Sequence, residues 1–256
     1  MIELVDLHKS FDNHKVLDGL SLHIKKGETM VIIGRSGCGK SVTLKHIIGV
    51  MKPDKGKIRV DGEEITKMND EDLNRVRLKI GMLFQGAALF DSLTVGENVG
   101  FLLREHSDLS EDQIRNKVRE SLALVGLKGI ENIMPSALSG GMRKRVGLAR
   151  AICSESLKII LYDEPTTGVD PIMGDVINNL IVSLHDKLNV TSVAVTHDMK
   201  SAFKIADRIA LLYKGKIIAV DEVEKIKNSK DPFVRQFVKG EATGPLTEGR
   251  IFKKRE

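Results

Sequence analysis

Cysteine and aromatic residues are scarce in this chain. Its 256 residues contain two cysteines, Cys38 and Cys153, no tryptophan, and an aromatic share of 4%. The two cysteines lie far apart, without a CxxC or Cys/His spacing, which excludes a disulfide framework and a zinc site of the usual kind. We therefore expect a reducing, cytoplasmic setting.

Long hydrophobic runs are also missing. No stretch approaches the roughly eighteen consecutive apolar residues of a membrane-spanning helix. The N-terminal residues MIELVDLHKSF alternate as a strand does, and they lack the basic start, apolar run and cleavage site of a signal peptide. If the protein serves a membrane, we expect it to do so from outside the bilayer.

The charges nearly balance. The formal charge of +5 is the difference between 40 basic and 35 acidic residues, so the pI near 9.1 reflects a slight excess of Lys and Arg. The sequence has no basic stripe interleaved with aromatic residues, so we predict no nucleic-acid partner. The 41% of hydrophobic residues suffices for a single α/β domain with a sizeable core.

Buried strands alternate with helical patterns along most of the chain. A half-buried strand is predicted over 20–24, and fully buried strands over 30–33, 158–162 and 191–195. A helix over about 41–50 follows the glycine-rich turn after the first buried strand, and helical patterns follow the two later ones. This alternation is typical of an α/β fold with a mainly parallel sheet and crossover helices.

Other segments interrupt this pattern. Between Gln85 and about Leu157 helical periodicity replaces the strand signal, so we predict a helical subdomain over about 86–157 inserted into a domain that spans 1–239. It includes a capping box at Ser110–Gln113. We also predict N-caps at Asp170 and Asp231, a hairpin over 209–220 and an extended tail over 240–256.

The segment GRSGCGKS, Gly34 to Ser41, matches the pattern of a phosphate-binding loop between a buried strand and a helix. Such a loop points consecutive backbone N–H groups at phosphate oxygens, and the helix N-terminus adds partial positive charge. Lys40 would lie between the β- and γ-phosphates, and the Ser41 hydroxyl would bind Mg²⁺. We predict ATP contacts from Gly34, Arg35, Ser36, Gly37, Cys38, Gly39, Lys40, Ser41 and Val42.

A metal anchor and a base are also needed for phosphoryl transfer. The segment KIILYDE, Lys158 to Glu164, ends a predicted strand with two carboxylates. Asp163 is predicted to hold hydrated Mg²⁺ and Glu164 to act as the general base. Taken alone, this segment would be read as an ordinary strand that ends in acidic residues; the phosphate loop in the same chain favours the catalytic interpretation.

The segment LSGGM, Leu138 to Met142, resembles the signature motif of ABC transporter ATPases. The resemblance implies a P-loop NTPase fold: a RecA-like, mainly parallel sheet with an antiparallel β-subdomain and an inserted α-helical subdomain. It also implies a head-to-tail homodimer, in which Ser139, Gly140 and Gly141 of one subunit bind the ATP held by the other. By itself, LSGGM could be a simple helix cap.

Further segments match the same family. Phe11 takes the place of the aromatic residue that stacks on adenine, with Val16 beneath it. Gln85 resembles the glutamine that senses Mg²⁺ and the attacking water and leads to the membrane-domain contact, and His197 resembles the switch histidine that reaches the γ-phosphate. Without the resemblance, these would be read as a core aromatic, a surface glutamine and a structural histidine.

Two segments depart from the family pattern. Thr167 to Asp170, TGVD, stands where the family usually has Ser-Ala-Leu-Asp in the loop that crosses the dimer. Because Asp170 and a hydroxyl at Thr167 remain, we expect the loop geometry to survive. Met142 replaces the commoner glutamine of the signature, which removes a polar contact near the nucleotide but leaves the anion site.

Longer stretches are similar to the Mla-type phospholipid-transport ATPases of diderm bacteria. They are residues 86–111, which include Leu-Arg-Glu-His at 103–106, and the segments 136–151 and 231–245. This similarity implies peripheral attachment to the cytoplasmic face of the inner membrane, beneath two copies of an integral permease. It also implies a periplasmic lipid-binding partner of the mammalian-cell-entry class, a small cytoplasmic regulator, and a C-terminal tail that straps the dimer.

Three alternatives stay open. The first is an ABC transporter ATPase for another lipid or solute, because ATPase subunits do not contact the cargo. The second is a soluble ABC-type assembly ATPase without a permease. The third, a DNA-clamping ABC ATPase, is disfavoured because only about a hundred residues without heptads separate the phosphate loop from LSGGM.

Overall fold

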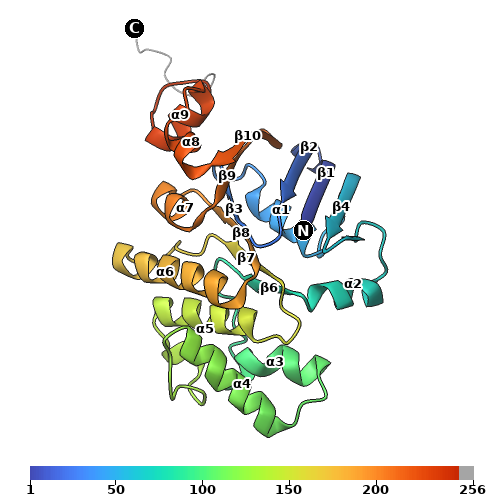
Figure 1. Ribbon diagram of the computed structural model, residues 1–256, viewed down its shortest axis with the longest axis vertical. Helices are drawn as coiled ribbons and strands as arrows, with labels where there is room; N and C mark the ends of the chain where they lie inside the picture. The colour runs from blue at the N-terminus through green and yellow to red at the C-terminus, as the bar shows by residue number, and fades with distance from the viewer. Residues whose placement is uncertain (248–256) are drawn as a thin grey trace.

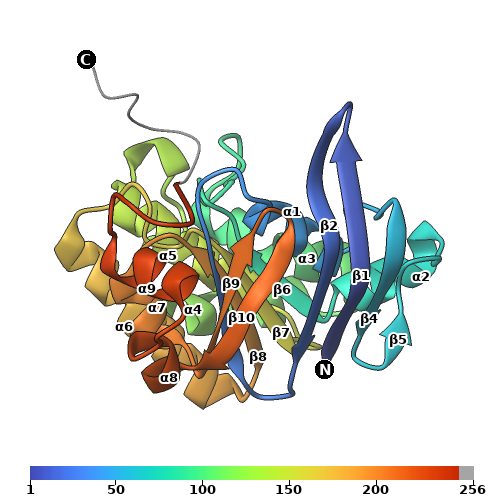
Figure 2. The same ribbon diagram turned by 90° about the horizontal axis from the view of Figure 1, so that it is seen from above.

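The chain folds around one large, mainly parallel sheet with a smaller antiparallel sheet beside it. A computed structural model describes residues 1–247. The large sheet has the strand order β10-β9-β3-β8-β7-β6, and the small sheet has the order β2-β1-β4-β5 (Figures 1 and 2). The large sheet contains β3 (Thr29–Ile33), β6 (Ile80–Leu83), β7 (Ile159–Asp163), β8 (Thr191–Thr196), β9 (Arg208–Tyr213) and β10 (Lys216–Glu222).

Parallel pairing joins β6, β7, β8, β3 and β9, and β10 returns antiparallel to β9 at one edge. The hairpin predicted over 209–220 is therefore confirmed, as are the buried strands predicted after residues 29, 157 and 190. The small sheet is antiparallel throughout. It consists of β1 (Ile2–Phe11), β2 (His14–Ile24), β4 (Lys55–Val60) and β5 (Glu63–Glu64).

Side chains that alternate along the central strands build two cores, one on each face of the large sheet. Val31, Ile33 and Tyr162 pack into the core that includes α5, α6 and α7. Met30, Ile32 and Leu161 pack on the other face, with α1 and the small sheet. Because strands buried on both faces need apolar residues at every position, they appear in the sequence as continuous apolar runs.

Helices connect the strands. They are α1 (Lys40–Ile47), α2 (Asp70–Arg77), α3 (Val95–His106), α4 (Glu111–Leu124), η1 (Pro135–Ala137), α5 (Gly140–Ile152), α6 (Pro171–Leu188), α7 (Met199–Ile205), α8 (Val223–Lys227) and α9 (Pro232–Lys239). The side chains of Ser110, Asp170 and Asp231 cap α4, α6 and α9 as the sequence predicts. No helix among residues 1–247 has the length and apolar character needed to cross a bilayer.

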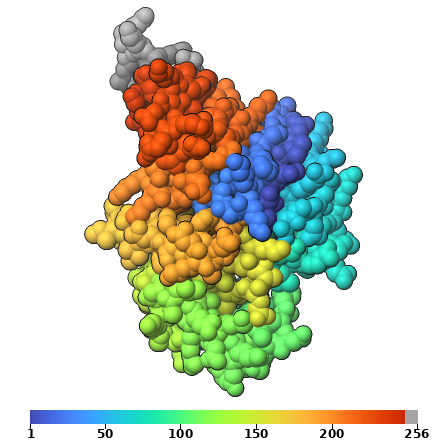
Figure 3. Space-filling view, viewed as in Figure 1, coloured from blue at the N-terminus to red at the C-terminus, as the bar shows by residue number. Residues whose placement is uncertain are grey.

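The segment between β6 and β7 contains α3, α4, η1 and α5 and forms a helical lobe beside the large sheet (Figure 1). In the space-filling view, this green lobe occupies the end of the molecule opposite the red C-terminal helices (Figure 3). Its apolar side chains, such as Val99, Leu103, Val118 and Leu122, join the core that contains Tyr162. The lobe therefore shares a core with the sheet domain.

The described part of the tail differs from the extended segment that we predicted. Gly240 ends α9 in a left-handed conformation, with φ of 65°. Residues 242–247 then form bends and turns, and Leu246 is buried. The buried side chain of Gln236 fixes them: its Oε1 accepts a hydrogen bond from Leu246 N at 2.7 Å, and its Nε2 donates to Glu241 O at 3.1 Å.

Gly56 provides a test of the packing between β4 and β1. It has φ of +99°, and a Cβ there would lie 2.4 Å from Asp6 O. We expect Gly56→Ala to lower the free energy of unfolding by about 2–4 kcal/mol, from left-handed strain and overpacking together. Gly62→Ala is the matched control, because Gly62 has φ of +85° with nothing within 4 Å of a Cβ. Gly62→Ala should lower the free energy of unfolding by about 1–2 kcal/mol, from the left-handed strain alone. If urea titrations gave equal losses of unfolding free energy for the two variants, the packing argument would be contradicted.

Candidate functional site

The predicted functional motifs meet at the carboxyl edge of the large sheet. The phosphate loop follows β3, Glu164 follows β7, His197 follows β8 and Gln85 follows β6. These four strands are consecutive in the sheet, in the order β3-β8-β7-β6. Since parallel sheets bind their ligands outside the carboxyl ends of the strands, the motifs lie where a nucleotide would bind.

The phosphate loop is shaped by its glycines. Gly37 and Gly39 have φ of +77° and +107°, conformations that other residues rarely adopt. A Cβ on Gly39 would come within 2.9 Å of the Leu17 side chain and 3.1 Å of that of Val16. Glycine at this position therefore lets the loop lie directly against β2, with the loop ending at the N-terminus of α1.

Lys40 lies at the start of α1 and is only 6% exposed. Its Nζ donates to Gly34 O at 2.9 Å and Arg35 O at 3.3 Å. It also forms an ion pair with Glu164, at 3.4 Å from Oε1. The ammonium is thus held between the phosphate loop and the carboxylate that we predict to be the general base.

Ser41 and Asp163, two of the three residues predicted at Mg²⁺ together with Gln85, are brought together across 122 residues of sequence. The Ser41 hydroxyl donates to Asp163 Oδ1 at 2.7 Å. Burial raises the pKa of Asp163, and the bond from Ser41 opposes that rise. A hydroxyl beside a carboxylate at a phosphate loop fits Mg²⁺, which completes its shell with phosphate oxygens and water. The pair is not part of a larger cluster of metal-binding side chains, because residues 1–247 contain no group of three or more His, Cys, Asp or Glu side chains suited to a metal.

Glu164 adopts a left-handed backbone, with φ of 48°, and is 8% exposed. Such strain costs about 1–3 kcal/mol in a residue other than glycine and is concentrated at functional sites. Its Oε2 lies 2.9 Å from His197 Nδ1 and accepts from the hydroxyls of Thr167 at 3.2 Å and Thr196 at 3.4 Å. The structure therefore brings the predicted base and the predicted switch histidine into direct contact.

Thr196 was missed by the sequence reasoning, although it immediately precedes His197. A hydroxyl at the last position of a buried strand that ends at the site is the signal that could have found it.

Two further predicted residues, Gln85 and Phe11, lie at the surface. Gln85 is exposed directly after β6, and Lys144 donates from α5 to its backbone oxygen. Phe11 is 42% exposed at the tip of the β1–β2 hairpin, where Lys9 Nζ lies 5.8 Å from its ring centroid. Val42 is partly buried on α1, among the side chains of the second core.

Cys38 is partly buried within the loop, and burial raises the pKa of its thiol. This disfavours the reactive thiolate form, so we interpret Cys38 as a small space-filling residue of the loop.

The signature segment lies at the N-terminus of α5. Ser139 caps this helix and accepts from Met142 N at 3.3 Å. Ser139 and Gly140 are exposed, and Gly141 is buried against Met173. A Cβ on Gly140 would lie 4.0 Å from Gly168 O, so this helix end adjoins the loop over 167–170. Within one subunit, Asp170 caps α6 by accepting from the N–H groups of Ile172 and Met173 at 3.0 Å.

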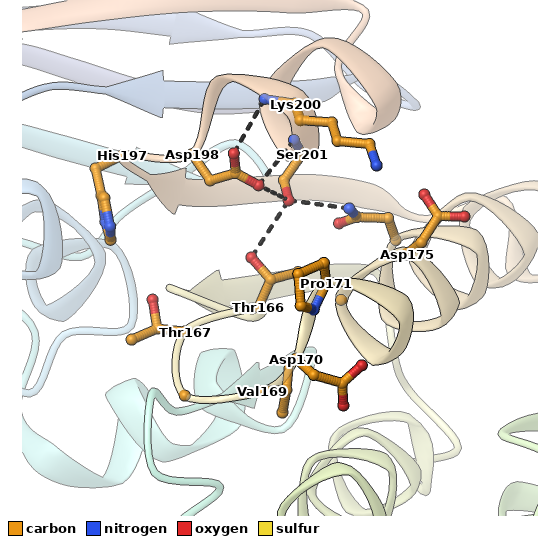
Figure 4. A pocket seen from close by; sticks show the side chains of 13 residues that line it. Thr166, Thr167, Val169, Asp170, Pro171, Asp175, His197, Asp198, Lys200 and Ser201 are labelled. Atoms are coloured by element: carbon orange, nitrogen blue, oxygen red, sulfur yellow. Dashed lines mark hydrogen bonds between the residues drawn. The ribbon is translucent and has the colours of Figure 1, made fainter. Parts of the chain in front are cut away.

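A hollow of about 380 Å³ separates this loop from the start of α7. Figure 4 shows His197 on one side of it and Thr167, Val169 and Asp170 on the other. At its base, Ser201 Oγ donates to Asp198 Oδ2 at 2.5 Å and lies 3.2 Å from Thr166 Oγ1. These bonds tie the segment after Glu164 to the segment after His197.

Comparison with known proteins identifies the family of the chain. The profile of the ABC transporter family matches residues 17–167. The chain belongs to the ABC transporter family. The family resemblance predicted from the sequence is thereby confirmed, and with it the assignment of the protein as an ATP-binding ABC ATPase.

Two curated relatives match nearly the whole length of this chain. The chain is 43% identical to protein TRIGALACTOSYLDIACYLGLYCEROL 3, chloroplastic, of Arabidopsis thaliana, over 96% of this chain and 75% of that protein. It is 42% identical to the intermembrane phospholipid transport system ATP-binding protein MlaF of Haemophilus influenzae, over 96% of this chain and 93% of that protein.

A solved structure matches as well. The ATP-binding cassette MJ0796, a dimer in a post-hydrolysis state with ADP and Pi, superposes with a TM-score of 0.81 at 32% identity, covering 87% of this chain and 99% of that one. The predicted P-loop NTPase fold is therefore confirmed.

Glu164→Gln tests the predicted base. We expect the rate of ATP hydrolysis to fall by roughly 10²–10⁴-fold, because the amide cannot accept the proton of the attacking water. ATP binding should persist, since the phosphate loop is unchanged. Glu28→Gln is the control: Glu28 is also buried and ion-paired, with Arg208, but it precedes β3 at the opposite end of the sheet. Full turnover in Glu164→Gln would remove this residue from its assigned role.

Proposed function

We propose that this ABC ATPase energises phospholipid transport between the inner and outer membranes and so maintains outer-membrane lipid asymmetry. The observation that carries the proposal is the 42% identity to MlaF, which extends over 96% of this chain and 93% of that protein. The alignment spans nearly the full length of both proteins, so the similarity extends beyond the segment with the nucleotide motifs. It supports the phospholipid assignment over that of a transporter for another lipid or solute.

We propose that two copies of the chain close on ATP and Mg²⁺ as a head-to-tail dimer. One subunit contains two anion-binding helix ends, at the phosphate loop before α1 and at Ser139 before α5. Ser139 and Gly140 are exposed, as a contact in trans requires. The similar cassette MJ0796 is also a dimer, which supports a dimer of this chain. In the closed dimer, Asp170 would lie in the loop that crosses beside the partner's site.

The surface beside Gln85 suits a membrane partner. Phe84 and Phe90 are 40% and 46% exposed, and Phe90 lies against Phe101 of α3 with ring centroids 5.0 Å apart. Exposed aromatic side chains next to a nucleotide-contacting turn favour a protein partner over solvent. We assign this surface to the integral permease, present in two copies.

We infer from this assignment that the ATPase lies at the cytoplasmic face of the inner membrane. A periplasmic lipid-binding protein of the mammalian-cell-entry class would attach through the permease, and a small cytoplasmic regulator would complete the complex.

The tail is the proposed dimer strap. Its described part packs on its own subunit, where Leu246 O accepts from Arg35 Nη1 of the phosphate loop at 2.8 Å. Residues 248–256 of the proposed strap lie outside the described residues. The strap would therefore start from a turn that contacts the nucleotide loop of its own subunit.

Ser139→Arg tests the shared site. The added charge and bulk would fall at the proposed subunit junction, so we expect ATP hydrolysis to be lost while the Kd for ATP of a single subunit stays unchanged. Ser110→Arg is a matched control, because Ser110 caps α4 in the same way through Gln113 N. It should retain hydrolysis. Retained hydrolysis in Ser139→Arg would argue against a site completed in trans.

The transport assignment is tested with the native complex. We expect the tagged chain, solubilised from its own membranes, to co-purify with a polytopic permease, and the complex to move phospholipid between vesicles only with hydrolysable ATP. The complex with Glu164→Gln should bind its partners without transfer. Recovery without a membrane subunit would support the soluble assembly ATPase instead, and movement of a different cargo would support another transporter.

A further inference from the structure

The turn after β6 contains two neighbouring alanines in a left-handed conformation. Ala87 and Ala88 have φ of +62° and +48°. This conformation is unfavourable for alanine because Cβ approaches the following carbonyl oxygen. Within the turn, Ala87 N donates to Phe84 O at 2.9 Å. One such bond does not explain two strained residues in a row, so contacts from outside the turn must hold it.

Basic side chains of α5 make those contacts. Arg150 donates from Nη1 to Ala88 O at 2.6 Å and from Nη2 to Ala87 O at 2.8 Å. Lys144, six residues earlier on the same helix, donates from Nζ to Gln85 O. Three carbonyl groups of the turn are therefore bound by two cations from one helix, and charged donors make the stronger class of hydrogen bond.

Glycines allow α5 to approach this closely. A Cβ on Gly147 would lie 3.2 Å from the Cβ of Ala87, and a Cβ on Gly81 would lie 2.0 Å from Ala151 O. The helix is therefore in direct contact with both the end of β6 and the turn that follows. Lys144 Nζ also lies 3.3 Å from Glu164 O, so the same ammonium contacts the backbone of Gln85 and of Glu164.

We propose that Arg150 and Lys144 are positioning residues that hold residues 85–88 in their strained form, so that Gln85 is presented to the nucleotide only while α5 is docked on the turn. Helix α5 starts within the signature, with Ser139 as its N-cap, so the signature and the two side chains that hold the turn belong to one helix. The inference rests on the proposed role of Gln85 at the nucleotide.

Arg150→Met tests the proposal in the full-length chain. Without the guanidinium the turn relaxes and Gln85 is displaced. We expect kcat for ATP hydrolysis to fall by roughly 10–100-fold, the range for a small misplacement of a reacting group. The Kd for ATP should stay unchanged, because Arg150 does not touch the phosphate loop. Arg150→Lys should show a similar loss, since one ammonium cannot satisfy both carbonyls in the planar geometry of the fork.

The deciding measurement is rescue by Ala88→Gly. Glycine adopts the left-handed conformation without steric cost, and Ala88 is exposed, so this change relieves strain without removing core packing. The double variants Arg150→Met/Ala88→Gly and Arg150→Lys/Ala88→Gly should regain most of the lost kcat. Asn189→Gly is the control, because Asn189 is exposed with φ of 48° at the end of α6, far from the turn in sequence. Combined with either Arg150 variant, Asn189→Gly should leave the loss of kcat unchanged.

Three outcomes overturn the proposal: full kcat in both Arg150 variants, no recovery with Ala88→Gly, or equal recovery with Asn189→Gly, which would indicate general stabilisation only. Gln85→Ala, measured in parallel, separates this inference from the proposed site. If Gln85→Ala retains full kcat, the assigned role of Gln85 is wrong. If Gln85→Ala loses activity and the Arg150 variants do not, only the positioning role is wrong.

Discussion

The arrangement of the site depends on one buried carboxylate, that of Glu164. A charge that is 8% exposed is costly unless donors surround it. Here the donors come from separate segments: Lys40 from the start of α1, Thr167 from the following loop, and Thr196 and His197 from the end of β8. Each segment must be placed correctly to supply its hydrogen-bond donor or cation, so the contacts of this carboxylate link the phosphate loop, the β7 end and the β8 end into one unit.

The parallel sheet makes that meeting possible. Strands β3, β8, β7 and β6 are neighbours and all end at the same edge. Their side chains alternate between two cores, which fixes the register of each strand. The register in turn fixes where the residue after each strand lies at the sheet edge. The groups predicted to act at the site can therefore lie close together, although they are as much as 157 residues apart in sequence, from Lys40 to His197.

Helix α5 connects this rigid centre to the signature. Its N-terminus carries Ser139 and the two signature glycines, its middle contacts Gln85 and Glu164 through Lys144, and its last turn holds Ala87 and Ala88 through Arg150. Strain in a turn that is maintained by contacts with another element can be released when that element moves.

The sequence alone determined the features that depend on local chemistry. Glycine spacing marked the phosphate loop, continuous apolar runs marked the buried strands, and Ser110, Asp170 and Asp231 marked helix starts, because each signal acts within a few residues. The acidic end of a predicted strand, taken with the phosphate loop, pointed to Glu164, and the family motifs then pointed to His197 and Gln85. Only the tertiary structure decided the partners of those residues and the turns at 242–247. It also decided the left-handed conformation of Ala87 and Ala88, since Arg150 enforces it from 62 residues away. An alanine has no intrinsic preference for that conformation, so no local pattern could indicate it.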